Sequence, residues 1–134
     1  MTRPIHFEIQ ATDMERARGF YARVFGWEYE DYSEYAGMPY FGIRTGGDDR
    51  PGIDGGMMLR RGPEPEPGRC VNAFVVTMAV EDYDAVGAEI AEAGGTVALP
   101  KYALPGMAWQ GYFHDTEGNI FGIHQPDEQA GLGG

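Results

Sequence analysis

Three side chains that can transfer protons or bind a metal ion lie near the two ends of the chain. His6 and Glu8 are two residues apart in the run Ile5 to Ala11, and His124 lies in the run Asn119 to Pro126. A carboxylate beside an imidazole can serve as a general base with an orienting partner. Two histidines with one carboxylate are also a ligand set that suits zinc or iron(II). The residue types therefore indicate proton transfer on a small molecule, with metal binding by the same three residues as an alternative.

Composition excludes several other classes of function. The 134 residues contain 10 Lys and Arg against 21 Asp and Glu, which gives a net charge of −11. So acidic a surface repels phosphate backbones and anionic lipids, and we expect neither nucleic acid nor a membrane as a partner. No apolar run approaches the roughly 20 residues that span a bilayer, and the first residues lack the apolar stretch of a secretion signal, so we expect a cytoplasmic protein. The single cysteine, Cys70, excludes an intrachain disulfide and a multi-cysteine zinc site.

The strands that carry these side chains have one apolar face each. In the run Ile5 to Ala11, apolar and polar residues alternate. The pattern predicts a strand that packs its apolar face on a helix and turns His6 and Glu8 toward a cavity. The same alternation in the last run turns Gly122 and His124 away from the helix. Both ends of the chain are thus expected to send a histidine to a cavity.

The two halves of the chain repeat one order of elements. A capping box formed by Thr12 and Glu15 begins a helix that ends at Gly26, and Asp82 can cap a second helix that ends at Gly94. The predicted strands are Ile5–Ala11, Trp27–Tyr32, Tyr40–Thr45 and Gly56–Arg61 in the first half, and Cys70–Val80, Thr96–Leu104, Gly106–Asp115 and Asn119–Pro126 in the second. Each half therefore follows the order β-α-β-β-β.

A proline-rich segment separates the halves. Residues 62–69 alternate proline with polar residues and can neither continue a helix nor lie inside a sheet. We therefore predict a single α+β domain over residues 1–126, with modules at about 4–61 and 70–126 joined by this segment. Residues 127–134 are polar or Gly-rich, and we expect a flexible tail.

Two motifs make the chain resemble a known superfamily. The first predicted helix ends in FYARVFGW at residues 20–27, and the last strand is entered through DTEGNIFGI at residues 115–123. With the tandem pattern over about residues 4–126, these motifs resemble the vicinal oxygen chelate superfamily of glyoxalases, extradiol dioxygenases and bleomycin-resistance proteins, and most closely its glyoxalase-like single-domain members. The resemblance implies mixed sheets curled around a cavity with the helices outside. In active members of the superfamily a metal ion is held by strand residues that face inward.

The metal site implied by the resemblance is not reproduced in this chain. Its ligand positions fall on His6, Met57 or Met58, Val75 and Gly122. Only His6 is a competent ligand, because Val and Gly offer no side-chain donor and a thioether binds hard or borderline cations weakly. We therefore expect no cofactor and no metal at this position. A divalent metal at His6, Glu8 and His124 is the alternative.

Two functions from different classes remain open. In the first, the chain is a glyoxalase-like lyase or isomerase, or a vestige of one, in which Glu8 is the general base and His6 or His124 orients an oxygen of a small carbonyl substrate. In the second, it is a non-catalytic protein that sequesters a small aromatic or cationic ligand, as bleomycin-resistance relatives do. Exposed aromatic residues on short strands also favour a homodimer. In either case the partner is a small organic ligand, and the residues expected to contact it are Tyr40, Met58, Val75, Trp109 and Tyr112.

Overall fold

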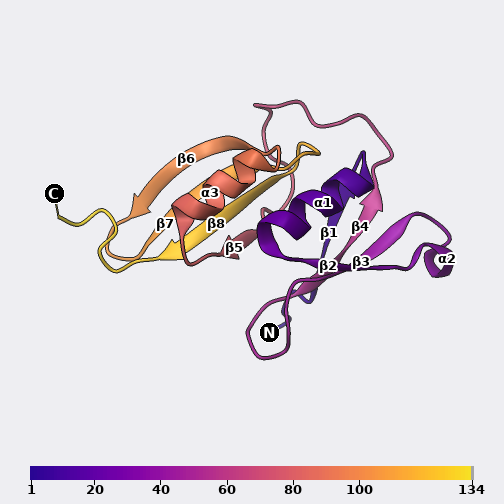
Figure 1. The fold of residues 1–134 in the computed structure, drawn as a ribbon, viewed down its shortest axis with the longest axis horizontal. Helices are drawn as coiled ribbons and strands as arrows, with labels where there is room; N and C mark the ends of the chain where they lie inside the picture. The colour runs from indigo at the N-terminus through magenta and orange to yellow at the C-terminus, as the bar shows by residue number, and fades with distance from the viewer. Residues whose placement is uncertain (134) are drawn as a thin grey trace. The chain divides into compact units, whose positions relative to one another are not determined.

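The computed structural model describes residues 1–133 and divides the chain into two units, Met1–Glu64 and Pro65–Gly134. The boundary falls within the proline-rich segment 62–69 (Figure 1). Each unit holds one four-stranded mixed sheet, and the predicted α+β class with two β-α-β-β-β modules is confirmed. Across residues 1–133, every helix is too short or too polar to cross a membrane.

The first unit is built on a sheet in which β1 and β4 are parallel neighbours. The strand order is β1-β4-β3-β2, and the other two pairings are antiparallel. The elements are β1 (His6–Ala11), α1 (Met14–Phe25), β2 (Glu28–Asp31), α2 (Ser33–Ala36), β3 (Tyr40–Arg44) and β4 (Asp54–Leu59). We call this sheet A.

Aromatic side chains attach α1 to one face of sheet A. The ring of Tyr21 on α1 stacks on Trp27 with centroids 4.9 Å apart, and Trp27 lies 5.6 Å from Phe7 on β1. The guanidinium of Arg18 lies 3.8 Å from the ring centre of Phe41 on β3. Phe7 and Phe41 therefore mark the helix face of sheet A, and we call the opposite face its open face.

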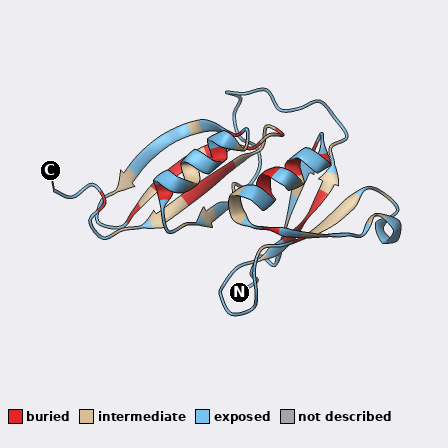
Figure 2. Ribbon diagram, in the orientation of Figure 1, coloured by how far each residue is buried: buried red, intermediate tan, exposed pale blue. Residues whose placement is uncertain are grey.

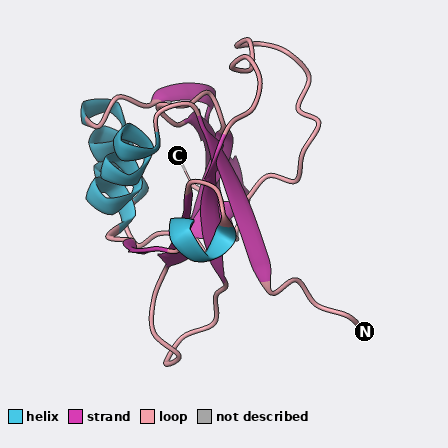
Figure 3. Ribbon diagram, turned by 90° about the vertical axis from the view of Figure 1, so that its right-hand side faces the viewer, coloured by secondary structure: helices cyan, strands magenta, loops and turns pink. Residues whose placement is uncertain are grey.

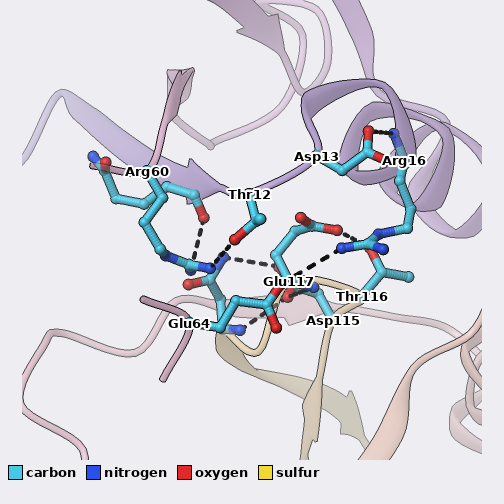
Figure 4. A network of polar contacts seen from close by, with 10 residues as sticks. Thr12, Asp13, Arg16, Arg60, Glu64, Asp115, Thr116 and Glu117 are labelled. Atoms are coloured by element: carbon cyan, nitrogen blue, oxygen red, sulfur yellow. Dashed lines mark hydrogen bonds and ion pairs between the residues drawn. The ribbon is translucent and has the colours of Figure 1, made fainter. Parts of the chain in front are cut away.

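The ends of α1 have clear local causes. Asp13 is the N-cap, because its side chain accepts a hydrogen bond from Arg16 N at 3.0 Å (Figure 4). The predicted cap, Thr12, was therefore wrong by one residue. The helix ends as predicted at Gly26, whose φ of 74° is costly for other residues and whose N–H donates to Ala22 O.

The second unit repeats the arrangement with one long helix, α3. Its strand order is β5-β8-β7-β6, with β5 parallel to β8. The elements are β5 (Thr77–Ala79), α3 (Tyr83–Glu92), β6 (Thr96–Leu104), β7 (Ala108–His114) and β8 (Ile120–Pro126). We call this sheet B. Asp82 caps α3 as predicted, since its side chain accepts from Ala85 N at 3.1 Å.

Each long helix lies against one face of its own sheet (Figure 3). On sheet B, the ring of Tyr83 lies 6.2 Å from Phe113, which lies 6.0 Å from Phe121. Ile90 on α3 and Ile123 on β8 are fully buried. Buried residues, red in Figure 2, gather where each helix meets its sheet. The burial of these apolar faces supplies the main stabilisation of each unit.

Two elements differ from their predictions. The strand predicted over Cys70–Val80 shrinks to Thr77–Ala79, and Phe74 is fully exposed. The reason is pairing, because within residues 1–133 β5 pairs with β8 alone and the last bond upstream runs from Gly122 N to Val76 O. The short helix Ser33–Ala36 was not predicted, because four residues are too few to show a helical period.

The last residues also have a defined place. Gly106 N donates to Ala130 O and Asp127 N donates to Met107 O, both at 2.8 Å. Ala130 is fully buried. Residues 127–132 therefore pack on the β6–β7 hairpin, in contrast to the flexible tail expected from their composition.

Candidate functional site

Three polar side chains meet on the open face of sheet A. The hydroxyl of Tyr40 donates to Glu8 Oε2 at 3.2 Å, and the hydroxyl oxygen of Tyr40 also lies 3.2 Å from His6 Nε2. His6 Nε2 and Glu8 Oε2 are 3.6 Å apart. An imidazole, a carboxylate and a phenol thus form one connected group, which supplies a proton acceptor and two hydrogen-bond partners for a polar oxygen.

Strand pairing explains why these three side chains meet. On β4, Gly56 pairs with Glu8 on β1, and Met58 pairs with Tyr40 on β3. Residues two apart on a strand share a face, so Glu8, Tyr40 and Met58 lie on the same side of the sheet. A Cβ at Gly56 would collide with the Tyr40 hydroxyl. The missing side chain of Gly56 therefore lets the Tyr40 ring cross β4 and reach β1.

The electrostatics of the group favour a neutral Tyr40. Burial, then the charge of Glu8, then the hydrogen bond to Glu8 raise the pKa of Tyr40 above its ordinary value. Its hydroxyl accordingly remains a donor at neutral pH. The side chains of His6 and Glu8 are 47% and 44% exposed, so a ligand can reach both of them.

A hollow of about 500 Å³ lies next to this group. Its lining residues are Tyr32, Tyr35, Ala36 and Tyr40. The Tyr32 ring covers Gly42, since a Cβ there would lie 2.6 Å from Tyr32 Cε2. Tyr40 therefore belongs to both features: its ring lines the hollow, and its hydroxyl joins His6 and Glu8.

On sheet B, His124 has its own partner. Its Nδ1 lies 2.8 Å from Oε1 of the buried Gln110. A Cβ at Gly122 would lie 2.7 Å from Thr77 Oγ1 and 3.0 Å from both Gln110 Nε2 and Tyr112 Cε1. The face of sheet B opposite α3 is therefore filled above Gly122 by a hydroxyl, an amide and a ring edge.

The other predicted contact residues are scattered. Trp109 and Tyr112 lie on opposite faces of β7, because Trp109 has the same parity as Phe113 on the helix face. The Trp109 ring lies 4.5 Å from Lys101 Nζ, and its Nε1 donates to Asp127 Oδ2 at 3.0 Å. Val75 is half-buried in the segment before β5. The structure thus brings together His6, Glu8, Tyr40 and Met58 on sheet A, and Tyr112 and His124 on sheet B.

Sequence reasoning missed two residues with polar roles. Gln110 is a lone amide in a strand of mostly apolar residues, and that contrast is a usable signal. Thr77 on β5 is the second of these residues. Its position beside Gly122 depends on the parallel pairing of β5 with β8, which no local pattern reveals.

The ligand positions implied by the family resemblance do not fit a metal ion. Val75 and Gly122 carry no donor, and the space in which a side chain at 122 would begin is taken by Thr77 and Gln110. Met57 is fully buried on the helix face of sheet A. No group of three His, Cys, Asp or Glu side chains within residues 1–133 is arranged to hold a metal ion.

Polar side chains within each unit have structural roles (Figure 4). In the first unit, Arg60 donates to Thr12 Oγ1 and to Gln10 O, each at 3.0 Å. In the second unit, Asp115 Oδ1 accepts from Glu117 N at 2.8 Å and from Asn119 N at 2.9 Å. The DTEGN motif therefore forms the turn between β7 and β8.

Comparison with known proteins places this geometry in context. Residues 3–123 match the model of the Glyoxalase/Bleomycin resistance protein/Dioxygenase superfamily. A protein named "Putative glyoxylase CFP32" in Mycobacterium bovis, and its namesake in Mycobacterium tuberculosis, are each 25% identical over 130 residues. Each match covers 96% of this chain and 47% of the relative, so the chain spans about half the length of these relatives.

Solved structures agree on the fold. The fosfomycin resistance protein FosX from Listeria monocytogenes superposes with a TM-score of 0.70 at 15% identity, over 95% of this chain and 93% of that one. A glyoxylase/bleomycin resistance protein/dioxygenase domain from Frankia sp. EAN1pec gives 0.68 at 14% identity, over 95% and 99% of the two chains. At such identities the likeness establishes the fold alone.

Proposed function

Because the chain belongs to the Glyoxalase/Bleomycin resistance protein/Dioxygenase superfamily, we propose that it is a glyoxalase-like isomerase of a small carbonyl compound. The observation that carries the proposal is the group formed by His6, Glu8 and Tyr40, in which Tyr40 Oη lies 3.2 Å from both partners. A carboxylate can take the proton from the carbon beside a carbonyl, and the two hydrogen-bonding neighbours can stabilise the charge that develops on the carbonyl oxygen.

The proposed step is a proton transfer without net oxidation. Glu8 takes the proton from the carbon beside the carbonyl, the C–H electron pair forms a carbon–carbon double bond, and the carbonyl π pair moves to oxygen. The hydroxyl of Tyr40 or the Nε2–H of His6 donates to that oxygen as its charge develops. Glu8 then returns the proton to the enolate, either to the same carbon or to its neighbour after the enediol has redistributed its protons.

Solvent exchange tests this proposal directly. The protein is incubated in D2O with a panel of small α-hydroxyketones and α-hydroxyaldehydes, and proton NMR follows deuterium entering the carbon beside the carbonyl. We expect exchange with at least one compound, and a loss of roughly 10²- to 10⁴-fold in Glu8→Gln, as for removal of a general base. Exchange that is absent across the panel, or unchanged in Glu8→Gln, would contradict the proposal.

A second candidate function is binding without turnover. The tyrosine-lined hollow beside Tyr40 favours it, because an apolar hollow next to a few polar groups is typical of ligand sites. In the same panel this function gives saturable binding with no deuterium in the compound. The homodimer and the cytoplasmic location expected from the sequence stay predictions under either function.

A further inference from the structure

The hollow beside the candidate site has walls of aromatic carbon. Tyr32, Tyr35 and Tyr40 line it together with Ala36, over about 500 Å³. The Tyr35 side chain is almost fully exposed, with a relative accessibility of 94% for the residue. Three phenol rings around one opening offer several π faces to a single group.

Backbone and side-chain hydrogen bonds fix the segment that carries these rings. Tyr40 N donates to Ser33 Oγ at 3.0 Å, and Tyr32 N donates to Tyr40 O at 2.9 Å. The short helix α2 ends at Gly37 with φ 73°, where Gly37 N donates to Ser33 O. The backbone that carries the three rings is therefore fixed before any ligand arrives, which lowers the entropic cost of binding.

The surroundings of the hollow are acidic. Tyr32 donates to Glu30 Oε2 at 2.8 Å, and Tyr40 donates to Glu8 Oε2 at 3.2 Å. A carboxylate that accepts a hydrogen bond from a phenol makes the phenol ring more electron-rich. The ring then attracts a cation above its face more strongly. Residues 28–36 contain four carboxylates and neither Lys nor Arg, within a chain of net charge −11. An anionic group would be repelled here, while a cationic group would be attracted.

We propose that this hollow binds the alkylated ammonium group of a small organic cation. Methylated ammonium suits the site because its methyl groups pack on apolar ring carbon and its spread charge meets the ring faces and the nearby carboxylates. The inference rests on the proposed function only in treating the open face of sheet A as the ligand face. It adds that the ligand whose oxygen reaches His6 and Glu8 carries a cation at its other end.

Choline and its uncharged isostere 3,3-dimethylbutan-1-ol provide a matched pair of probes. The two have the same shape and hydroxyl and differ in the positive charge. NMR titration of the intact chain measures both dissociation constants. We expect choline to bind at least about tenfold more tightly, the combined effect of several aromatic faces and two carboxylates. Equal affinity for the two probes, or binding of neither, would overturn the inference.

Variants at Tyr35 separate the aromatic effect from packing. Tyr35→Phe keeps the ring and should leave choline binding within about twofold, whereas Tyr35→Leu keeps apolar bulk without a π face and should weaken it about three- to tenfold. Glu30→Gln keeps an acceptor for Tyr32, removes one charge, and should weaken binding of choline but not of the neutral alcohol. Unchanged choline affinity in Tyr35→Leu would contradict the inference.

Failure of this inference is distinguishable from failure of the proposed function. Choline selectivity without deuterium exchange in the carbonyl panel would contradict the isomerase function and support the cation site. Deuterium exchange that depends on Glu8, without choline selectivity, would contradict the cation site and support the isomerase function.

Discussion

The hydroxyl of Tyr40 lies over Gly56, in the place that a side chain at position 56 would occupy. Tyr40 is on β3, and β4 separates this strand from β1. The glycine therefore allows a residue from one strand to contact His6 and Glu8 two strands away. The candidate site therefore requires a glycine at position 56 in addition to its three polar side chains.

Substituting Gly56 should break this relationship. In Gly56→Ala the new methyl group displaces the Tyr40 ring, and we expect at least about tenfold weaker binding or exchange with a stability cost of about 1–3 kcal/mol for overpacking. Urea denaturation and the exchange assay measure the two effects. Gly19→Ala is the matched control, because a Cβ there meets nothing within 4 Å and a helical alanine should stabilise by roughly 0.5–1 kcal/mol. Full activity in Gly56→Ala would show that Tyr40 has no role.

Neighbouring residues on β1 should behave in opposite ways. Phe7 packs against Trp27 on the helix face, so Phe7→Ala should lower the free energy of unfolding by about 2–4 kcal/mol, less than for a fully buried Phe. Glu8 is exposed, so Glu8→Ala should change stability by about 0.5 kcal/mol or less while weakening ligand binding. Denaturation curves and a ligand titration check both. The reverse pattern would mean that the faces of β1 are assigned the wrong way round.

A buried hydroxyl on β2 predicts a stabilising substitution. Tyr29 Oη is buried with no hydrogen-bond partner, and such a group costs about 1–3 kcal/mol. Tyr29→Phe should therefore raise the free energy of unfolding at neutral pH by about 1 kcal/mol. Denaturation with urea at pH 7 measures the gain, and a loss of stability would imply a partner for the hydroxyl.

The same residue predicts a pH dependence. Burial raises the pKa of Tyr29 well above its ordinary value of 10, and the charge of Arg18 opposes this only in part. Below pH 10 the folded and unfolded chains both hold the proton. Above it the unfolded chain releases the proton first, so the free energy of unfolding falls as pH rises. Stability measured between pH 8 and 11 should fall less steeply in Tyr29→Phe, and an identical slope would contradict the assignment.

Local sequence patterns account for much of the fold. Alternation in Ile5 to Ala11 assigned the faces of β1, and Asp82 and Gly26 marked helix ends correctly. Alternation could also have separated Trp109 from Tyr112, since residues three apart on one strand lie on opposite faces. Local sequence patterns could not predict contacts that depend on pairing between strands. The meeting of Tyr40 with Glu8 needs the β1-β4-β3 order and the register that sets Gly56 between them.

The C-terminal residues show the same limit. Their composition favours a flexible tail, yet Ala130 O accepts from Gly106 N at 2.8 Å and Ala130 is fully buried. A chain ended after Pro126 should lose about 1–3 kcal/mol of stability, because Gly106 N and Trp109 Nε1 lose their partners. A chain ended after Leu132 is the control and should match the full chain. Thermal unfolding of both truncations decides the point, and equal melting temperatures would favour the flexible tail.

The most direct test of the ligand face uses two adjacent methionines on β4. Met58 is half-buried on the open face of sheet A beside Tyr40, and Met57 is fully buried on the helix face. With 13C-labelled methionine methyl groups, NMR can follow both while choline or an exchanging carbonyl compound is added. We predict that the Met58 methyl signal shifts with saturation and that the Met57 signal stays in place. A saturable shift of Met57 with Met58 unchanged would contradict the account.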